Sequence, residues 1–319
     1  MPLPFLLAGA AIVAGVGGVG TGIHGGVKIK DATDTMEHAK GIMEDAQESV
    51  EKNNKKALNT MDKIGKRELE ILSSFKEFSD LIEKIQGRPE FKNYKQDKYD
   101  IPEYNPEKLK KVALDAKLLL GGLGGTAAGT VGGIAAAGSV SDLTLAALGG
   151  GTIAVGGGGA ALGIAIIGGA TLGIGLLVGG IIFNFTGNKM SDKADEAYSQ
   201  AKKAQKDAEK IVGYLSELNN IANKFYNAIN SAASVYEGLL SELDKIINYK
   251  HKILWSEYND SEKLLVENLA LMVGILYKSC QTNIVKENKN TDNFNEINNK
   301  GITEAIEDCQ KVVIDIKAS

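Results

Sequence analysis

The chain has 319 residues, a net charge of −4 at neutral pH and a hydrophobic fraction of 44%. This length allows a large core or two average domains. The acidic balance argues against a nucleic-acid-binding surface, which needs a concentrated basic face. The two cysteines, Cys280 and Cys309, and the three histidines fit no zinc or disulfide spacing. We therefore expect no metal, no cofactor and no catalytic residue set, so the chain is not predicted to be an enzyme.

Glycine is frequent and unevenly distributed along the chain. There are 38 glycines, against about 22 expected at the usual frequency, and 31 of them fall in residues 1–27 and 118–188. The first tract carries no charged side chain, and Asp142 is the only one in the second tract. Soluble domains alternate apolar and polar residues at short periods, whereas apolar blocks of this length are typical of membrane proteins.

The N-terminal segment, residues 1–27, is apolar from its beginning (MPLPFLLAGAAIVAGVGGVGTGIHGGV). A secretory signal peptide, cleaved after the Ala-Gly-Ala stretch, is one interpretation. No lysine or arginine precedes the apolar run, however, and the run is longer than a usual signal-peptide core. A retained, membrane-seeking segment is therefore the preferred interpretation.

Two long stretches, residues 28–87 and 189–252, carry apolar residues at a sustained spacing of three or four. In the first stretch fourteen of sixteen such positions are apolar, the exceptions being Asn53 and Glu68. In the second stretch all sixteen are apolar. The first set is Ala32, Met36, Ala39, Met43, Ala46, Val50, Asn53, Ala57, Met61, Ile64, Glu68, Ile71, Phe75, Phe78, Ile82 and Ile85. The second set is Ala194, Ala197, Ala201, Ala204, Ala208, Ile211, Leu215, Leu218, Ala222, Phe225, Ile229, Ala232, Tyr236, Leu239, Leu243 and Ile246. This pattern predicts two long coiled-coil helices, each about 80 Å in length.

Side-chain size along the two seams predicts their relative direction. Both seams begin with small residues, such as Ala39 and Ala201, and end with large ones, such as Phe75 and Phe78 in the first. Small residues allow helices to approach closely, so the end of each helix with the small seam residues is called its narrow end. Both narrow ends adjoin a glycine-rich tract. We therefore expect a parallel pair with the narrow ends together and the wide ends in a distal bundle.

Residues 88–117 are predicted to form the return path between the two long helices. The sequence Gly-Arg-Pro at 87–89 stops the first helix. Asn105 and Pro106 then read as an N-cap and a first helical residue, starting a helix that continues into the apolar tract.

Residues 253–319 are predicted to complete the distal bundle. A strongly apolar helix is expected over 257–286, because apolar residues lie on more than one of its faces. The last helix carries one apolar stripe, formed by Ile302, Ala305, Cys309, Val313 and Ile316. Packing of these helices on the wide end gives a bundle of four or five helices, and the predicted fold class is all-α.

Small residues recur every four positions in both glycine-rich tracts. They flatten one face of a helix so that backbones approach closely, as in membrane helices. Glycine costs about 1 kcal/mol relative to alanine inside an aqueous helix, whereas lipid enforces helix formation. We expect these residues to mediate membrane contact and oligomerisation. The candidate set is Gly18, Gly22, Gly26, Gly121, Gly125, Gly129, Gly133, Asp142, Gly159 and Gly163.

The long tract, residues 118–188, is predicted to form an apolar hairpin. Residues 118–138 are long enough for one membrane-spanning helix, residues 139–142 form a polar turn, and residues 143–183 are too long for a single returning span. A tight, permanently soluble glycine- and alanine-rich core, sheltered by the amphipathic helices, is the alternative.

Lysines that flank the apolar tracts, among them Lys28, Lys117 and Lys189, suggest a topology. Short basic segments prefer the cytoplasmic side of a membrane. We therefore expect a membrane-associated protein with a cytoplasmic coiled stalk. A soluble precursor state that precedes membrane association is a further expectation. Ordinary solvated helix ends are the alternative explanation of these lysines.

The heptad runs 32–85 and 194–246 around the apolar segment 118–183 resemble the α-helical pore-forming toxins of the cytolysin A and haemolysin BL kind. Apolipoprotein-L-like proteins look similar at the same coarse level. The stretch 146–163 (AALGGGTIAVGGGGAALG), with the opening MPLPFLLAGAA, is similar to a group of uncharacterised bacterial glycine-zipper membrane proteins. The toxin resemblance implies membrane insertion and pore formation, while the bacterial resemblance implies no activity.

The leading hypothesis is a membrane-inserting, oligomerising α-helical protein. The toxin resemblance implies that such a protein forms pores and acts as a toxin or defence effector. One alternative is a constitutive membrane-anchored coiled-coil scaffold that recruits a partner. Another is a soluble phage or assembly structural protein. The expected partners are a lipid bilayer, further copies of the chain and a protein bound through the coiled-coil stalk, but not a nucleic acid.

Overall fold

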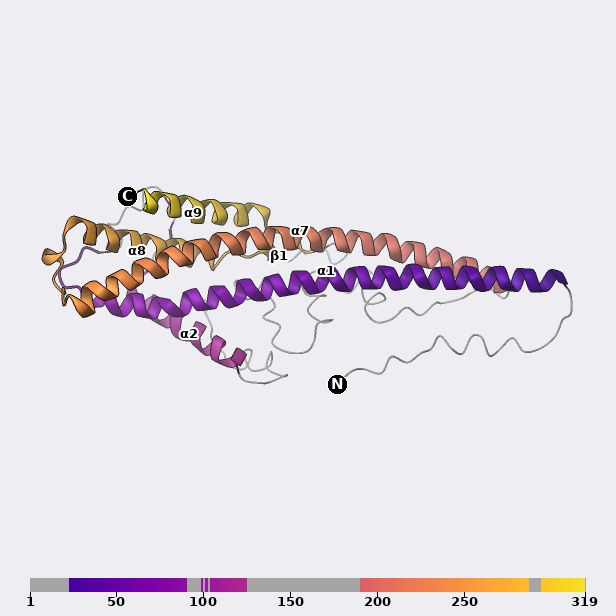
Figure 1. Ribbon diagram of the computed structural model, residues 1–319, viewed down its shortest axis with the longest axis horizontal. Helices are drawn as coiled ribbons and strands as arrows, with labels where there is room; N and C mark the ends of the chain where they lie inside the picture. Colours follow the sequence, from indigo (N-terminus) through magenta and orange to yellow (C-terminus); the bar gives the residue numbers. More distant parts are fainter. Residues whose placement is uncertain are drawn as a thin grey trace. The chain divides into compact units, whose positions relative to one another are not determined.

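The computed structural model describes residues 23–90, 99, 101–102, 104–124, 190–286 and 294–318. Most of these residues are helical, and Figure 1 shows the order of the elements. The α-helices are α1 (Ile23–Glu83), α2 (Pro106–Gly124), α7 (Met190–Asp244), α8 (Asp260–Ser279) and α9 (Asn299–Lys317). A π-helix (Lys245–Tyr249), a 3-10 helix (Trp255–Glu257) and two short strands, β1 (Val285–Lys286) and β2 (Glu296–Ile297), accompany them. The all-α fold class is confirmed for this part of the chain.

The chain divides into two compact units, and α1 and α7 contribute residues to each. Unit 1 comprises residues 1–46 and 181–206, and unit 2 comprises residues 47–180 and 207–319. In unit 1 the two helices bury a cluster of mostly small side chains beside the edge-to-face rings of His38 and Tyr198, whose centroids are 5.7 Å apart. The cluster consists of Ala39, Ile42, Met43, Ala197 and Ala201. The small seam predicted from the sequence is therefore buried here.

In unit 2, α1 and α7 run parallel. Thr60 bonds to Asn219, Ser74 lies within hydrogen-bond distance of Tyr236, and Lys84 bonds to Asn248. Residue numbers rise together along the two helices, which confirms the predicted direction. Left-handed supercoiling of the pair remains a prediction.

The core of unit 2 is built from large side chains, as the seam pattern predicted. Phe75, Phe78 and Ile82 of α1 are fully buried against residues of α7 and α8 such as Phe225 and Tyr277. The Phe75 ring meets Tyr236 edge to face at 5.8 Å, a favoured geometry for aromatic pairs.

The return path joins this core through α2. Gly87 adopts a φ of 72°, in the left-handed region that glycine tolerates, and α1 ends shortly before it. The Asn105 side chain accepts a hydrogen bond from the backbone N–H of Lys108 at 2.8 Å, which confirms the predicted cap. Lys110 of α2 then pairs with Glu83 of α1 at 2.6 Å.

The helix predicted over 257–286 is shorter in the structure. Asn259 and Glu262 form a capping box at the start of α8, and the helix ends at Ser279. Residues 285–286 instead pair with 296–297 as an antiparallel sheet, where Asn298 Nδ2 donates to the Asn283 carbonyl at 2.7 Å. Tertiary hydrogen bonding therefore overrides the apolar helical pattern. Helix α9 then packs on α8 and runs in the opposite direction (Figure 1). It buries the predicted stripe from Ile302 to Val313, whereas Ile316 is only partly buried.

The transmembrane interpretation requires correction. Among the residues that the structure describes, no helix is both long enough and apolar enough to cross a membrane. The most apolar long helix, α8, carries Asp260, Glu262, Lys263, Glu267 and Lys278, and α2 contains several charged residues before its apolar end. The membrane, transmembrane and pore-forming assignments made from the sequence are therefore wrong for these helices. The tract beyond Gly124 lies outside the described residues.

Candidate functional site

The residues predicted to mediate oligomerisation lie mostly outside the described part of the chain. These are Gly18, Gly22, Gly125, Gly129, Gly133, Asp142, Gly159 and Gly163. Gly26 lies in α1 and Gly121 lies in α2, in different units. The structure does not bring members of this set together among the residues it describes, and their role stays a prediction.

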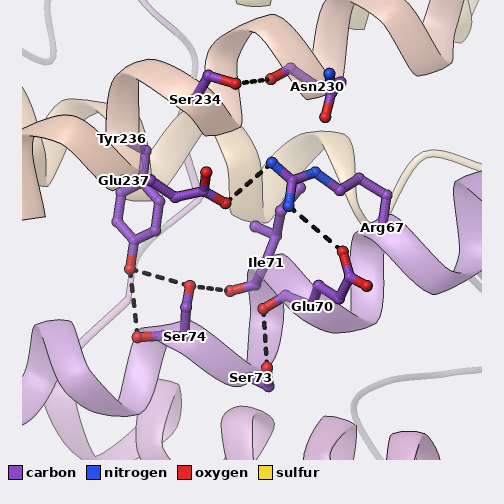
Figure 2. A network of polar contacts seen from close by, with 9 residues as sticks. All are labelled: Arg67, Glu70, Ile71, Ser73, Ser74, Asn230, Ser234, Tyr236 and Glu237. Carbon is purple, nitrogen blue, oxygen red and sulfur yellow. Dashed lines mark hydrogen bonds and ion pairs between the residues drawn. The ribbon is translucent and has the colours of Figure 1, made fainter.

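A polar layer lies between α1 and α7 in unit 2. Figure 2 shows the guanidinium of Arg67 between two carboxylates, Glu70 on its own helix and Glu237 on α7. Arg67 Nη2 lies 2.9 Å from Glu237 Oε1, and Arg67 Nη1 lies 3.4 Å from Glu70 Oε2. Because the Arg67 side chain is largely buried whereas its partners are exposed, the layer fixes the two helices at the edge of the core.

The second part of this layer is the buried hydroxyl of Tyr236. It donates to the Ser74 carbonyl at 3.3 Å and lies 3.2 Å from Ser74 Oγ, which itself donates to the Ile71 carbonyl (Figure 2). Burial raises the pKa of Tyr236, so the phenol remains neutral and serves as a hydrogen-bonding group.

A third polar contact lies farther toward the N-terminal half of α1. Thr60 is 7% exposed, and its hydroxyl donates to Asn219 Oδ1 at 2.7 Å. Asn223 Nδ2 also contacts Asn219 Oδ1, at 3.2 Å. A partly buried polar pair between two helices favours one register, because a shifted register leaves its atoms unpaired.

Glu68 is the most unusual ionisable residue in the described core. It is 2% exposed, and its Oε2 atom has no hydrogen-bond partner. Burial raises the pKa of Glu68 well above the ordinary value. A carboxyl oxygen without a compensating bond makes ionisation costly in an apolar interior, so burial favours the protonated form of Glu68.

Two thiols lie in the same core. Burial raises the pKa of Cys280, with a further contribution from Glu68. Burial likewise raises the pKa of Cys309 to about 11, although its contact with Ser279 Oγ at 3.3 Å acts in the opposite direction. Protonated, buried thiols are poor nucleophiles and poor metal ligands.

The described residues offer few other groups that could bind a metal ion or take part in catalysis. Within the ranges given above, no group of three or more His, Cys, Asp or Glu side chains is placed to hold a metal ion. The contacts of the polar layer instead join α1 to α7.

A different kind of surface forms where α7 turns into α8. The chain leaves α7 through the π-helix, passes His251 at a φ of 57° and then runs extended beside the end of α1. Gln86 N–H donates to the Ile253 carbonyl at 2.7 Å, and Trp255 N–H donates to the Gln86 carbonyl at 2.9 Å. We call the exposed part of this turn the tip surface. It consists of Lys84, Tyr249, Lys250, Ile253, Leu254 and Trp255.

The tip surface exposes apolar side chains on a fixed backbone. Tyr249 is 77% exposed, and Ile253 and Leu254 are each 41% exposed. Trp255 is partly exposed, with its ring stacked on Tyr258 at 5.5 Å between centroids. A non-glycine residue in the left-handed region, such as His251, and a π-helical turn are features that concentrate at functional sites.

Comparisons with known proteins give no relative for this site or for the chain. No protein-family model matches, and no curated protein or solved structure is similar at a significant level.

The sequence contained a signal for only part of this arrangement. Glu68 interrupts the heptad seam of α1, and a charged residue at a seam position indicates a buried carboxyl. The sequence does not distinguish the exposed from the buried aromatic residues of this turn. Tyr258 is buried, whereas Tyr249 is exposed, because the π-helical turn changes the register after Asp244.

Proposed function

We propose that this chain is a non-catalytic scaffold, in which α1 and α7 form a parallel pair that holds the helices of unit 2 rigid for a protein partner. The observation that carries the proposal is the series of polar contacts between the two helices and between the residues that directly follow them. Thr60 with Asn219, Arg67 with Glu237 and Lys84 with Asn248 maintain one alignment over several turns.

Polar contacts of this kind support a structural role. They contribute less to stability than well-packed apolar residues of similar volume, but they select one register. A protein that uses several of them requires a defined alignment of α1 and α7. The heptad seams add left-handed supercoiling of this pair to the proposal.

The groups with catalytic potential support the same view. Glu68, Cys280 and Cys309 are buried, and burial raises the pKa of each. Buried groups that no substrate can reach do not act as general acids, general bases or nucleophiles. Insertion into a bilayer is not part of this proposal, because no described helix is suited to cross one.

In-cell crosslinking tests the scaffold proposal. The full chain, tagged at its C-terminus, is crosslinked in the native cell and purified under denaturing conditions. We expect a discrete adduct that contains this chain and a second protein in fixed ratio. The same purified chain is also mixed with dye-loaded vesicles, where no flotation with lipid and no dye release are expected.

Three results would overturn the proposal. They are the absence of any protein adduct, adducts that contain copies of this chain alone, and dye release from the vesicles. The second result would instead support a homo-oligomer, and the third a membrane-active protein.

A further inference from the structure

We infer that α1 of one chain binds α1 of a second copy in antiparallel orientation, through an exposed face that is acidic in its first half and basic in its second half. Two antiparallel copies of such a helix bring opposite charges together at every step. The inference goes beyond the proposed function and does not depend on it, because it concerns two copies of this chain and not a different protein.

The charges of α1 change sign at one point of the helix. Residues 31–51 contain seven acidic residues and one lysine, whereas residues 52–67 contain five lysines, one arginine and one aspartate. Helix α1 runs unbroken from Ile23 to Glu83, so both stretches belong to one element. Alternating signs would stabilise a helix through pairs at i,i+4, whereas like charges at this spacing repel each other. Separate acidic and basic blocks therefore favour contacts with another molecule over contacts within the helix.

The exposed charges of both blocks lie on the same side of α1. At about 100° per residue, they fall within about 60° of a line along the helix, away from the buried seam residues Ala39, Val50 and Ala57. All of these charged side chains are exposed. We call them the charged face of α1, which consists of Asp34, Glu37, Asp45, Glu48, Lys52, Lys55, Lys56, Lys63 and Lys66.

The charged face is not neutralised within the part of the chain that the structure describes. None of its side chains forms an ion pair or a hydrogen bond with a described residue. Charges beside it are paired, since Lys40 lies 3.5 Å from Glu44 and Arg67 contacts both Glu70 and Glu237. The charged face thus remains available to a second molecule.

A two-fold axis near position 50 of α1 places acidic positions against basic ones. In a symmetric interface, residue i of one copy meets residue j of the other, and j meets i. Antiparallel copies related by this axis bring together positions whose numbers add up to 100 or 101, and the uncharged Gly41 then meets Asn59. The opposite-charge pairs are Asp34 with Lys66, Glu37 with Lys63, Asp45 with Lys56 and Glu48 with Lys52.

Other occupants match only half of the charged face. A parallel second copy would place each charge against its own equivalent. An anionic lipid surface or an acidic segment of another protein would fit residues 52–66 but would be repelled by the carboxylates of residues 34–48. Exposed ion pairs are individually weak and are screened by salt. We therefore expect a weak dimer that dissociates as the salt concentration rises.

Analytical ultracentrifugation of the full chain tests the dimer. We expect a dimer at about 20 mM salt and a dissociation constant at least about tenfold higher at about 500 mM salt. A triple charge reversal of the basic half should also raise the dissociation constant at least about tenfold. This variant is Lys52→Glu, Lys56→Glu, Lys63→Glu. The matched control reverses three exposed lysines of α7, which changes the net charge equally and should weaken the dimer much less. The control is Lys203→Glu, Lys206→Glu, Lys224→Glu.

A complementary variant tests whether the two halves bind each other. Reversal of the acidic half makes the charged face basic throughout, so this variant alone should stay monomeric at low salt. Its substitutions are Glu37→Lys, Asp45→Lys and Glu48→Lys. Mixed with the triple lysine variant, it should form a heterodimer at least as stable as the wild-type dimer, because every pair is again of opposite charge. Circular dichroism confirms that each variant is folded.

Crosslinking tests the antiparallel direction. A chain with Asp45→Cys is mixed with a chain with Lys56→Cys and treated with a short bismaleimide, while the native Cys280 and Cys309 remain buried. We expect more crosslinked dimer from the mixture than from either variant alone. A parallel arrangement would give the reverse result, because it brings the same position of both copies together.

Several results would overturn the inference. These are a wild-type chain that is monomeric at low salt, equal weakening by the α7 control, and charge-reversed variants that stay monomeric when mixed. Binding of the monomer to phosphatidylglycerol vesicles without a dimer would assign the basic half to lipid instead. The wild-type salt series decides between dimer and monomer even if a variant fails to fold. The scaffold proposal is tested separately, by the adduct with a second protein.

Discussion

Thr60 of α1 donates a hydrogen bond to Asn219 of α7 at 2.7 Å, although the two residues are 159 positions apart in the sequence. The pair lies beside the mostly apolar seam of the two helices. It therefore links two helices through an interaction that exists in only one alignment of the pair.

Removing this bond should destabilise unit 2. Thr60→Val keeps the shape of the side chain and leaves Asn219 with less hydrogen bonding, which we expect to cost about 1 kcal/mol in the free energy of unfolding. Urea denaturation measures this difference. Thr35→Val, whose hydroxyl bonds only to the Asp31 carbonyl on its own helix, is the control and should change stability less. Equal losses of unfolding free energy in the two variants would show that the contact between the helices does not contribute to stability.

Glu68 should make the protein less stable as the pH rises. Burial raises the pKa of Glu68 in the folded chain, so the folded state holds this proton more tightly than the unfolded state. The contribution is fully present below the unfolded pKa of about 4.3 and decreases as the pH rises above it. Glu68→Gln removes this dependence, and we expect it to be more stable than the wild type at neutral pH by about 1 kcal/mol or more.

Urea denaturation across a pH series measures the Glu68 effect. The exposed Glu77→Gln on the same helix is the control and should follow the wild-type pH profile. A Glu68→Gln profile parallel to that of the wild type would contradict protonation of this residue in the core.

Gly274 should not tolerate alanine. A Cβ atom there would collide with Ile101 and approach Tyr104 Cε1 to 3.2 Å, because Tyr104 is held against α8 by a bond to the Ala270 carbonyl. Gly274→Ala should therefore lower the melting temperature, despite the usual gain of about 1 kcal/mol for alanine in a helix. Gly238→Ala in α7 has open space around it and should raise the melting temperature. If both variants are stabilised, residues 101–104 do not pack on α8 in solution.

Cys280 and Cys309 should react with thiol reagents only when the core opens. Both thiols are buried, and burial raises the pKa of each. We expect the rate of modification by dithionitrobenzoate to rise in urea together with unfolding. Rapid modification of the native protein at neutral pH would contradict the buried positions of these residues.

The heptad pattern predicted the long helices and their parallel direction because both depend on local spacing and side-chain size. It also identified most of the buried positions of α1, such as Phe75 and Phe78, but not Leu69, Leu72 and Leu81. The membrane assignment rested on the apolar tracts, and the charges of α2 and α8 exclude it for the described helices.

The tip surface could not be predicted from the spacing of apolar residues along the sequence. Its exposure arises because Lys245–Tyr249 forms a π-helical turn and His251 reverses the chain. The pairing of Gln86 with Leu254 joins segments far apart in the sequence, and no local pattern contains that information. The strands at 285–286 and 296–297 escaped prediction for the same reason.

The parallel direction of α1 and α7 also determines when the two helices can meet during synthesis. The bonds between them join residues that are 159 to 164 positions apart. At about 5–20 residues per second, the ribosome needs roughly 8–30 s to make the intervening chain. Throughout that interval the apolar stripe of α1 lacks its α7 partner, so the nascent protein is exposed to aggregation. A holdase chaperone that binds amphipathic helices would shield α1 until α7 emerges.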